Sequence, residues 1–204
     1  MALRIRPSRS TLSDGSAPSA RFRDAVVGRR GQPARSLDGV SLAVAPGGFT
    51  AILGPAGSGK STLLRCLAGD EQLTSGHVLI GDVDLTSLRS RPLRRLCDER
   101  IAALSGASTS EAAWFEAILG TTAQPDDGPQ WAAAVRELAC WPKLILADDV
   151  AAGTGLAAFL RRMVDAFGQT VVMATRDPAV ATRADHSIRL CRGRVVQRAS
   201  AVAA

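Results

Sequence analysis

Short apolar runs recur along the chain, each bounded by glycine, proline or charged residues. Runs of about five residues rich in valine, isoleucine and leucine predict buried or half-buried strands. The pattern predicts strands at residues 22–27, 40–44, 49–53, 77–80, 83–85, 101–104, 144–147, 170–174, 187–191 and 194–196. The last two flank Arg192-Gly193 and are expected to pair as a hairpin, beyond which the chain is expected to fray.

Helical patterns fall between the strands. Residues 62–68 read as a helix, and residues 87–100 have a helical charge pattern with five arginines that is broken near Pro92. Residues 111–119 and 130–139 are weaker helical candidates with a polar loop between them. Alternation of strands and helices in this way predicts an α/β fold.

One strand leads into a glycine-rich loop and then into a helix. After residues 49–53 the chain reads GPAGSGKS, which fits the pattern G-x-x-x-x-G-K-[ST] without a gap. Glycines let main-chain N–H groups converge on one point, where the helix dipole adds positive potential. We therefore expect a nucleoside triphosphate to bind here, against the alternative of a flexible surface loop. The binding residues are Gly54, Pro55, Ala56, Gly57, Ser58, Gly59, Lys60, Ser61 and Thr62.

Two residues of this phosphate loop (residues 54–62) have distinct expected roles. Lys60 is expected to reach the β- and γ-phosphates as a point charge, and the Ser61 hydroxyl to coordinate Mg²⁺. The chain has only two lysines against twenty-three arginines. A compact ammonium at position 60 is therefore kept in a sequence that otherwise uses arginine.

A second polar cluster closes the strand at residues 144–147. Asp148 and Asp149 follow this strand directly, and ligands of open α/β sheets bind beyond the carboxyl ends of the strands. We expect Asp148 to hold Mg²⁺ through water opposite Ser61, with Asp149 beside the attacking water. The alternative is a polar turn without chemistry. The strand at residues 170–174 likewise ends in polar residues.

Composition narrows the classes of function. At 204 residues and 46% hydrophobic content, the chain is long enough for one well-buried domain. Its four cysteines form no C-x-x-C pair and its two histidines are far apart, which argues against a metal cage or a disulfide framework. No apolar run approaches the ~20 residues that a membrane span needs. We expect a cytoplasmic protein that can rest peripherally on a membrane partner at the inner face of the cell membrane.

The net charge of +6 is unevenly distributed. Residues 1–100 and 161–204 carry the basic surplus, whereas residues 101–160 are acidic. A basic surplus is compatible with nucleic acid, but no RNA-binding aromatic motif or helix-turn-helix accompanies it. A solvated arginine-rich surface is the favoured interpretation, and nucleic acid is not an expected partner.

Three stretches resemble the ATP-binding subunit of ABC transporters, particularly the lipoprotein-release and macrolide-export type. They are SLDGVSLAVAPGGFTAILGPAGSGKSTLLRCLAGDEQLTSGHVLIGDVDL, PKLILADD and QTVVMATRDPAVATRADHSIRLCRGRVV. The resemblance covers residues 22–104 and 129–197. It implies an α/β P-loop NTPase fold of the ABC ATPase type, with a mixed, largely parallel central sheet, a small antiparallel β lobe and a reduced helical lobe. It also implies ATP and Mg²⁺ as ligands.

The resemblance also divides the chain and implies its partners. Residues 21–198 are expected to form the ATP-binding domain, with a shortened helical subdomain at 105–130. Residues 1–20, rich in arginine and serine, and residues 199–204 are expected to be disordered tails. The implied partners are a second ATP-binding subunit, identical or different, and a membrane permease.

The departures from the family fall on positions used for hydrolysis. Asp149 stands where the family has a glutamate, and its carboxylate is one methylene shorter. Arg176 stands in the place of the switch histidine; it can stabilise γ-phosphate charge but cannot shuttle a proton. Ser105 lies near the expected Q-loop glutamine, and Val27 replaces the aromatic that stacks on adenine.

Coupling positions depart as well. Residues 124–128 replace the LSGGQ signature and bring two aspartates that would repel the partner's γ-phosphate, and Thr154-Gly155 replaces the Leu-Asp of the D-loop. The resemblance therefore implies an ABC-type ATPase with Asp149 and Arg176 as catalytic residues and with weak or partner-dependent hydrolysis. The alternative is a non-catalytic nucleotide-binding regulator.

Overall fold

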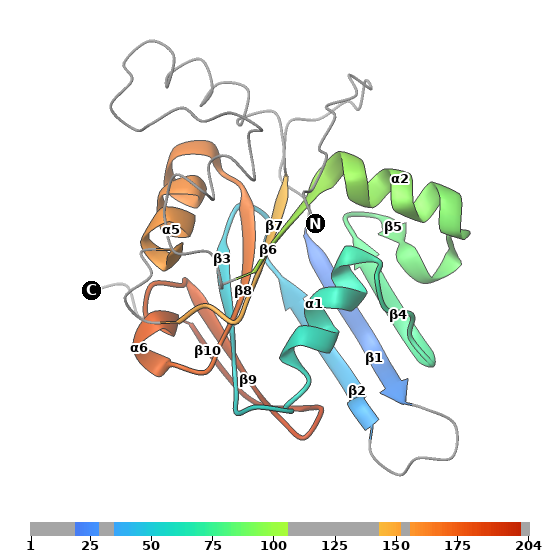
Figure 1. Ribbon diagram of the computed structural model, residues 1–204, viewed down its shortest axis with the longest axis horizontal. Helices are drawn as coiled ribbons and strands as arrows, with labels where there is room; N and C mark the ends of the chain where they lie inside the picture. Colours follow the sequence, from blue (N-terminus) through green and yellow to red (C-terminus); the bar gives the residue numbers. More distant parts are fainter. Residues whose placement is uncertain (1–18, 29–34, 106–142, 152–155, 201–204) are drawn as a thin grey trace.

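A computed structural model describes residues 19–28, 35–105, 143–151 and 156–200 of the chain. These residues form two sheets with helices between and beside them (Figure 1). The helices expected at 111–119 and 130–139, the shortened subdomain beyond residue 105 and most of both expected tails lie outside the described residues.

The larger sheet has six strands in the order β10-β9-β3-β8-β7-β6. Their bounds are Phe49–Leu53 for β3, Ile101–Ser105 for β6, Leu144–Asp148 for β7, Thr170–Thr175 for β8, His186–Cys191 for β9 and Arg194–Ser200 for β10. Neighbouring strands are parallel except β9 and β10, which pair as the expected antiparallel hairpin. The expected mixed central sheet is confirmed.

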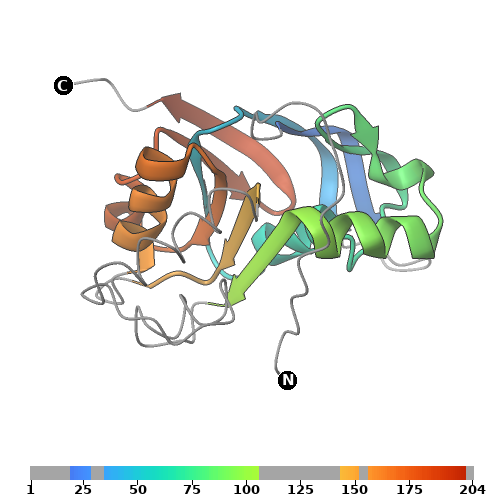
Figure 2. The same cartoon turned by 90° about the horizontal axis from the view of Figure 1, so that it is seen from above.

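The smaller sheet is antiparallel throughout, with the order β2-β1-β4-β5. Its strands are β1 (Ala20–Gly28), β2 (Arg35–Val44), β4 (Ser75–Ile80) and β5 (Val83–Asp84). Helix α1 (Lys60–Ala68) lies between the two sheets and buries its leucines there (Figure 2). The expected small antiparallel lobe is therefore confirmed.

Two local expectations are wrong. Helix α2 (Ser90–Arg100) is not broken at Pro92, because the proline lies in the first helical turn, where no intrahelical partner exists for a backbone N–H. Leu85 does not extend its strand but opens the 3-10 turn η1 (Leu85–Ser87), since the Asp84 side chain accepts a hydrogen bond from the Thr86 N–H and bends the chain.

Both expected tails also overlap the described strands. β1 begins at Ala20, which is fully buried and paired with Val44. β10 continues to Ser200 and does not fray after Val196, because β9 offers it a partner as far as His186. Ala20, Ala199 and Ser200, which the sequence analysis places in the tails, therefore belong to strands.

Helices α5 (Leu156–Phe167) and α6 (Pro178–Ala181) are absent from the sequence-based prediction. Leu156, Phe159 and Leu160 share one face of α5 at helical spacing and pack on one face of the larger sheet. Helix α1 and the smaller sheet cover its other face. Both faces are therefore buried, as a largely parallel sheet requires.

Candidate functional site

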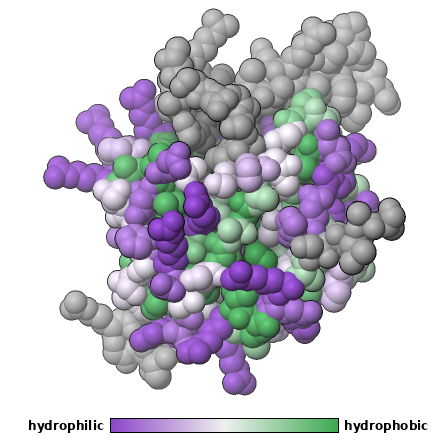
Figure 3. Space-filling model, turned by 180° about the vertical axis from the view of Figure 1, so that it is seen from behind, coloured by the Kyte–Doolittle hydropathy of each residue, from purple (hydrophilic) through white to green (hydrophobic). Residues whose placement is uncertain are grey.

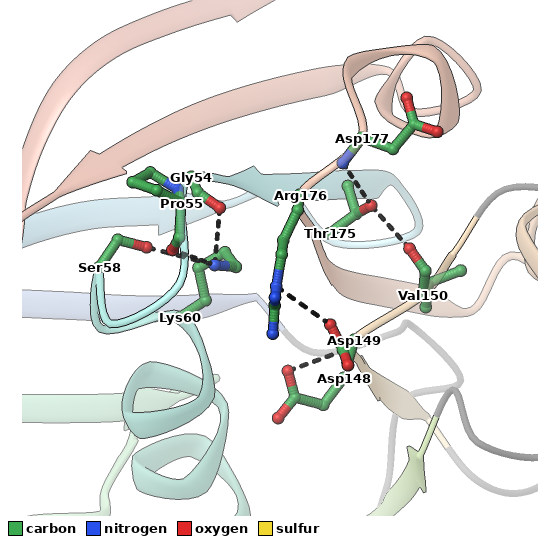
Figure 4. Close-up of polar contacts among 10 residues, drawn as sticks. All are labelled: Gly54, Pro55, Ser58, Lys60, Asp148, Asp149, Val150, Thr175, Arg176 and Asp177. Carbon is green, nitrogen blue, oxygen red and sulfur yellow. Dashed lines mark hydrogen bonds and ion pairs between the residues drawn. The ribbon is translucent and has the colours of Figure 1, made fainter.

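The polar residues expected to act together lie at one edge of the larger sheet (Figure 4). The phosphate loop follows β3, Asp148 and Asp149 close β7, and Arg176 follows β8. Because β3, β7 and β8 are parallel neighbours, their carboxyl ends meet at the same edge. The structure therefore brings together the three segments that sequence reasoning selected.

Two glycines allow the phosphate loop to pass close to other backbone. A Cβ at Gly54 would lie 2.3 Å from the Leu190 carbonyl oxygen, and a Cβ at Gly59 would lie 2.3 Å from the Ser36 carbonyl oxygen. Gly59 also has φ of +104°, a conformation that side chains disfavour. The loop is therefore shaped by contacts with β2 and β9 as well as by its own sequence.

The tip of the β9–β10 hairpin supports the loop from outside. The Gly193 N–H donates to the Ser58 carbonyl at 3.0 Å, and the Asp38 N–H donates to the Gly193 carbonyl at 2.9 Å. Ser58 is buried. One glycine of the hairpin thus joins the loop to both sheets, a role that sequence reasoning missed because Gly193 is far from the loop in sequence.

The Lys60 side chain is folded back over the loop. Its Nζ donates to the Gly54 carbonyl at 2.7 Å, to the Pro55 carbonyl at 2.8 Å and to Ser58 Oγ at 3.3 Å (Figure 4). Burial lowers the pKa of the ammonium below its ordinary value of 10.5, and the nearby Arg176 lowers it further. An anion placed beside Lys60 would favour its charged form.

The helix that follows the loop presents an uncapped N-terminus. Gly59 is its N-cap and makes no side-chain capping bond, and no acidic residue lies in the first turn. The first N–H groups of α1 therefore remain suited to an anion, which the helix dipole also favours. Together with Lys60, this donor set fits the phosphates of a nucleotide.

Oxygen donors suited to Mg²⁺ stand on both sides of the same edge. Ser61 is exposed at the start of α1, with Thr62 half-buried beside it, and Asp148 is half-buried at the end of β7. Hydroxyl and carboxylate oxygens are the ligands that Mg²⁺ prefers. The side chains present fit the expected ion, and Ser61 and Asp148 are the residues that would hold it.

Asp149 is held differently from its neighbour. Its backbone has φ of +53°, and its N–H donates to Asp148 Oδ1 at 2.9 Å. Its own carboxylate points to Arg176, with Oδ1 3.5 Å from the guanidinium Nε (Figure 4). Both side chains are largely exposed, at 68% for Asp149 and 61% for Arg176, so the ion pair is weak and easily exchanged.

A buried threonine positions this pair. Thr175 Oγ1 donates to the Val150 carbonyl at 2.7 Å and accepts from the Asp177 N–H at 3.1 Å. The Val150 N–H in turn donates to the Ala174 carbonyl at 3.0 Å. These bonds tie the segment after β7 to the end of β8. Sequence reasoning noted Thr175 only as a polar residue at a strand end.

The other expected departures have mixed outcomes. Ser105 ends β6 in register with Asp148, so its backbone lies beside the site edge. Val27 is buried in the core with β2 and offers no exposed face for stacking. Residues 124–128 and Thr154-Gly155 lie outside the described residues. Within the described ranges, no helix is both long and apolar enough to cross a bilayer.

Comparisons with known proteins agree with this geometry. Residues 37–120 match the family described as "ABC transporter". The chain is 30% identical to the lipoprotein-releasing system ATP-binding protein LolD of Anaeromyxobacter dehalogenans, over 78% of this chain and 84% of that protein. It is 33% identical to the macrolide export ATP-binding/permease protein MacB of Rhodospirillum rubrum, over 81% of this chain.

The chain spans only 31% of the length of that MacB protein. Among solved structures, the dimeric ATP-binding cassette MJ0796, in a post-hydrolysis state bound to ADP and Pi, superposes with a TM-score of 0.70. That match covers 90% of this chain and 99% of the cassette. At 22% sequence identity it establishes the fold alone.

Proposed function

The chain belongs to the ABC transporter family of ATP-binding proteins, and on this premise we propose that it binds Mg·ATP and hydrolyses it weakly or only with a partner. One observation carries the proposal: the phosphate loop, the Asp148-Asp149 pair and Arg176 converge at one sheet edge (Figure 4). Main-chain N–H groups of residues 54–62 and the Lys60 ammonium would hold the phosphates, and Ser61 and Asp148 would hold Mg²⁺.

Three side chains of this chain have distinct roles in the proposed reaction. Lys60 leaves its loop carbonyls for phosphate oxygens, exchanging neutral acceptors for charged ones. Asp149 would orient the attacking water and accept its proton, and Arg176 would steady the charge that develops on the phosphate. When bound, Mg²⁺ supplies further neutralisation of phosphate charge.

Weak turnover follows from the way Asp149 and Arg176 are placed. The Asp149 carboxylate is one methylene shorter than the family's glutamate, and the Arg176 guanidinium 3.5 Å from it cannot carry a proton as the family's histidine can. Misplacing one catalytic contact costs about 2–4 kcal/mol of barrier, a factor of roughly 30 to 10³ in rate. The same two departures from the family, at positions 149 and 176, favour the second candidate, a nucleotide-binding regulator without turnover.

The proposed setting of this activity is a transporter. We expect a second ATP-binding subunit, identical or different, and a membrane permease, with the chain on the cytoplasmic side of the membrane. The support is indirect: the similar cassette MJ0796 is dimeric, and the similar MacB protein is named as an ATP-binding/permease protein.

The test is nucleotide affinity and phosphate release, with and without Mg²⁺, for the wild type, Lys60→Ala and Lys143→Ala. Lys143 precedes β7 at the end of the sheet away from the site, so it is the matched control. Loss of a charge-assisted contact to phosphate predicts about a 100-fold loss of ATP affinity in Lys60→Ala only. Saturable binding without Lys60-dependent release identifies the regulator. No binding at millimolar ATP overturns both candidates.

A further inference from the structure

A groove between the two sheets lies outside the site described above. β2 and β10 are the outer strands of different sheets in the described part of the chain, and they contact each other. The Asp38–Gly193 backbone bond joins them at one end. Beyond it, two adjoining hollows of about 510 and 480 Å³ separate the strands. Arg198 lines both hollows, and the two hollows together are called the groove below.

Backbone groups of β2 face this groove. In an antiparallel strand, successive residues turn their N–H and C=O groups alternately to the two sides. The Ser41 carbonyl accepts a bond from Arg198 Nη2 at 2.5 Å, so it points away from β1 and towards β10. By this alternation the backbone of Ala43, two residues further on, points the same way, and Ala43 is among the residues that line the second hollow. The groove therefore offers the outer edge of β2 to an incoming chain, which would take the place of Arg198 at the Ser41 carbonyl.

The groove is also cationic and partly apolar. Arg194, Arg198 and Arg21 line it, whereas Asp38 is the single carboxylate among its lining residues. That carboxylate is already engaged by Arg194 at 2.6 Å and by a second arginine, Arg35, at 2.8 Å. The lining thus has a surplus of positive charge.

An apolar side chain stands in the same place. Val196 lines the first hollow and is 58% exposed, the one large hydrophobic residue so exposed among the described residues. Figure 3 shows apolar surface in the middle of this face, with hydrophilic side chains around and across it. Alternation of exposed charge and apolar surface suits an extended segment, whose side chains alternate in direction.

We propose that this groove binds an acidic, extended segment of a partner protein by strand addition along β2 and β10. Carboxylates of the segment would pair with Arg198 and Arg21, and an apolar side chain would cover Val196. The six residues of β10 that line the groove, 194–199, span about 20 Å at about 3.3 Å each. A segment of about six residues would therefore cover the groove. The proposal concerns a different surface from the nucleotide site and stands whether or not the chain hydrolyses ATP.

The test is fluorescence anisotropy with labelled octapeptides that alternate Glu with Val or Thr. We expect saturable binding that weakens at least tenfold in Arg198→Glu and in Val196→Asp, and less than twofold in Arg183→Glu. Arg183 is the matched control because it is exposed after α6 and does not line the groove. Peptides N-methylated along one edge should not bind, since strand addition requires their N–H groups.

Three results would overturn the proposal. One is no saturable binding by any peptide of the series. The second is equal binding by wild type and Arg198→Glu, with folding of the variant confirmed by circular dichroism. The third is self-association in sedimentation experiments that Val196→Asp abolishes, since the occupant would then be a second copy of this chain.

Discussion

The two halves of the site differ in how firmly the surrounding fold holds their residues in place. The phosphate loop is in tight contact with backbone on both sides, and its lysine is buried with three hydrogen-bond acceptors. Asp149 and Arg176 are largely exposed and face each other across a 3.5 Å ion pair. The half that would hold a nucleotide is preorganised, whereas the half that would act on it is loosely held.

The two halves of the site also differ in how readily they tolerate substitution. Preorganised phosphate binding depends on backbone packing that few substitutions can reproduce. An exposed pair of side chains can change with little effect on the fold, because surface positions cost little when altered. This contrast supports the proposal that the chain binds nucleotide and hydrolyses it weakly or only with a partner.

The largest expected effect comes from breaking the packing of the loop. Gly59→Ala places a Cβ 2.3 Å from the Ser36 carbonyl oxygen at φ of +104°, so we expect a loss of about 2–3 kcal/mol in the free energy of unfolding. ATP affinity should fall with it. Urea unfolding and calorimetric titration with ATP measure the two effects.

Gly57→Ala is the matched control for that substitution. Gly57 also has positive φ, +71°, but a Cβ there meets nothing within 4 Å. Only the backbone penalty of about 1 kcal/mol is expected. Equal losses in the two variants would show that contact with β2 does not shape the loop.

The next largest effect is expected from removing the buried Thr175 hydroxyl, which supports the segments that carry Asp149 and Arg176. Thr175→Val keeps the shape of the side chain but leaves the Val150 carbonyl and the Asp177 N–H without their hydroxyl partner. We expect a loss of about 1–2 kcal/mol in the free energy of unfolding, measured by urea unfolding. Thr182→Val, which removes an exposed hydroxyl bond to Ala179, should cost less. A neutral Thr175→Val would mean that the strand ends are positioned without it.

A third variant asks whether the loosely held half can be improved. Asp149→Glu with Arg176→His lengthens the base by one methylene, removes its permanent cation and adds a group that can carry a proton. We expect ATP-dependent phosphate release to rise about tenfold, equal to about 1.4 kcal/mol of barrier. Asp149→Glu alone should gain less, because Arg176 still faces the carboxylate. No gain in the double variant would place the defect elsewhere.

The sequence was sufficient for the features that depend on local patterns. The phosphate loop is recognisable because glycine, lysine and serine are required at fixed spacing between a strand and a helix. Asp149 was selected because it follows an apolar strand, and Arg176 because it stands in the place of the switch histidine of the family that the chain resembles. The spacing of Leu156, Phe159 and Leu160 also predicts a helix, and α5 was missed although this signal was present.

Features that depend on distant pairing could not be predicted in this way. The bond from Gly193 to Ser58 and the ion pair of Asp149 with Arg176 join segments that only the strand order brings together. A positive φ at Asp149 is likewise no property of its local sequence. The sequence therefore identified the site residues but not their state of pairing.

The smallest expected effect concerns Asp38 of β2, which is bonded to the Gly193 turn that supports the phosphate loop. Hydrogen bonds from Arg194 and Arg35 hold the pKa of Asp38 below its ordinary value of 3.8. A lowered pKa in the folded state means that the charged Asp38 stabilises the fold above about pH 3.8. This stabilisation is lost as the pH falls through the folded-state pKa.

Asp38→Asn should therefore lower the urea midpoint slightly at pH 6. The difference between the urea midpoints of the variant and the wild type should vanish below the folded-state pKa of Asp38. Because Arg194 supplies the largest share, the difference should also shrink in an Arg194→Gln background. A difference that persists unchanged in acid would show that the substitution acts through something other than the charge of Asp38.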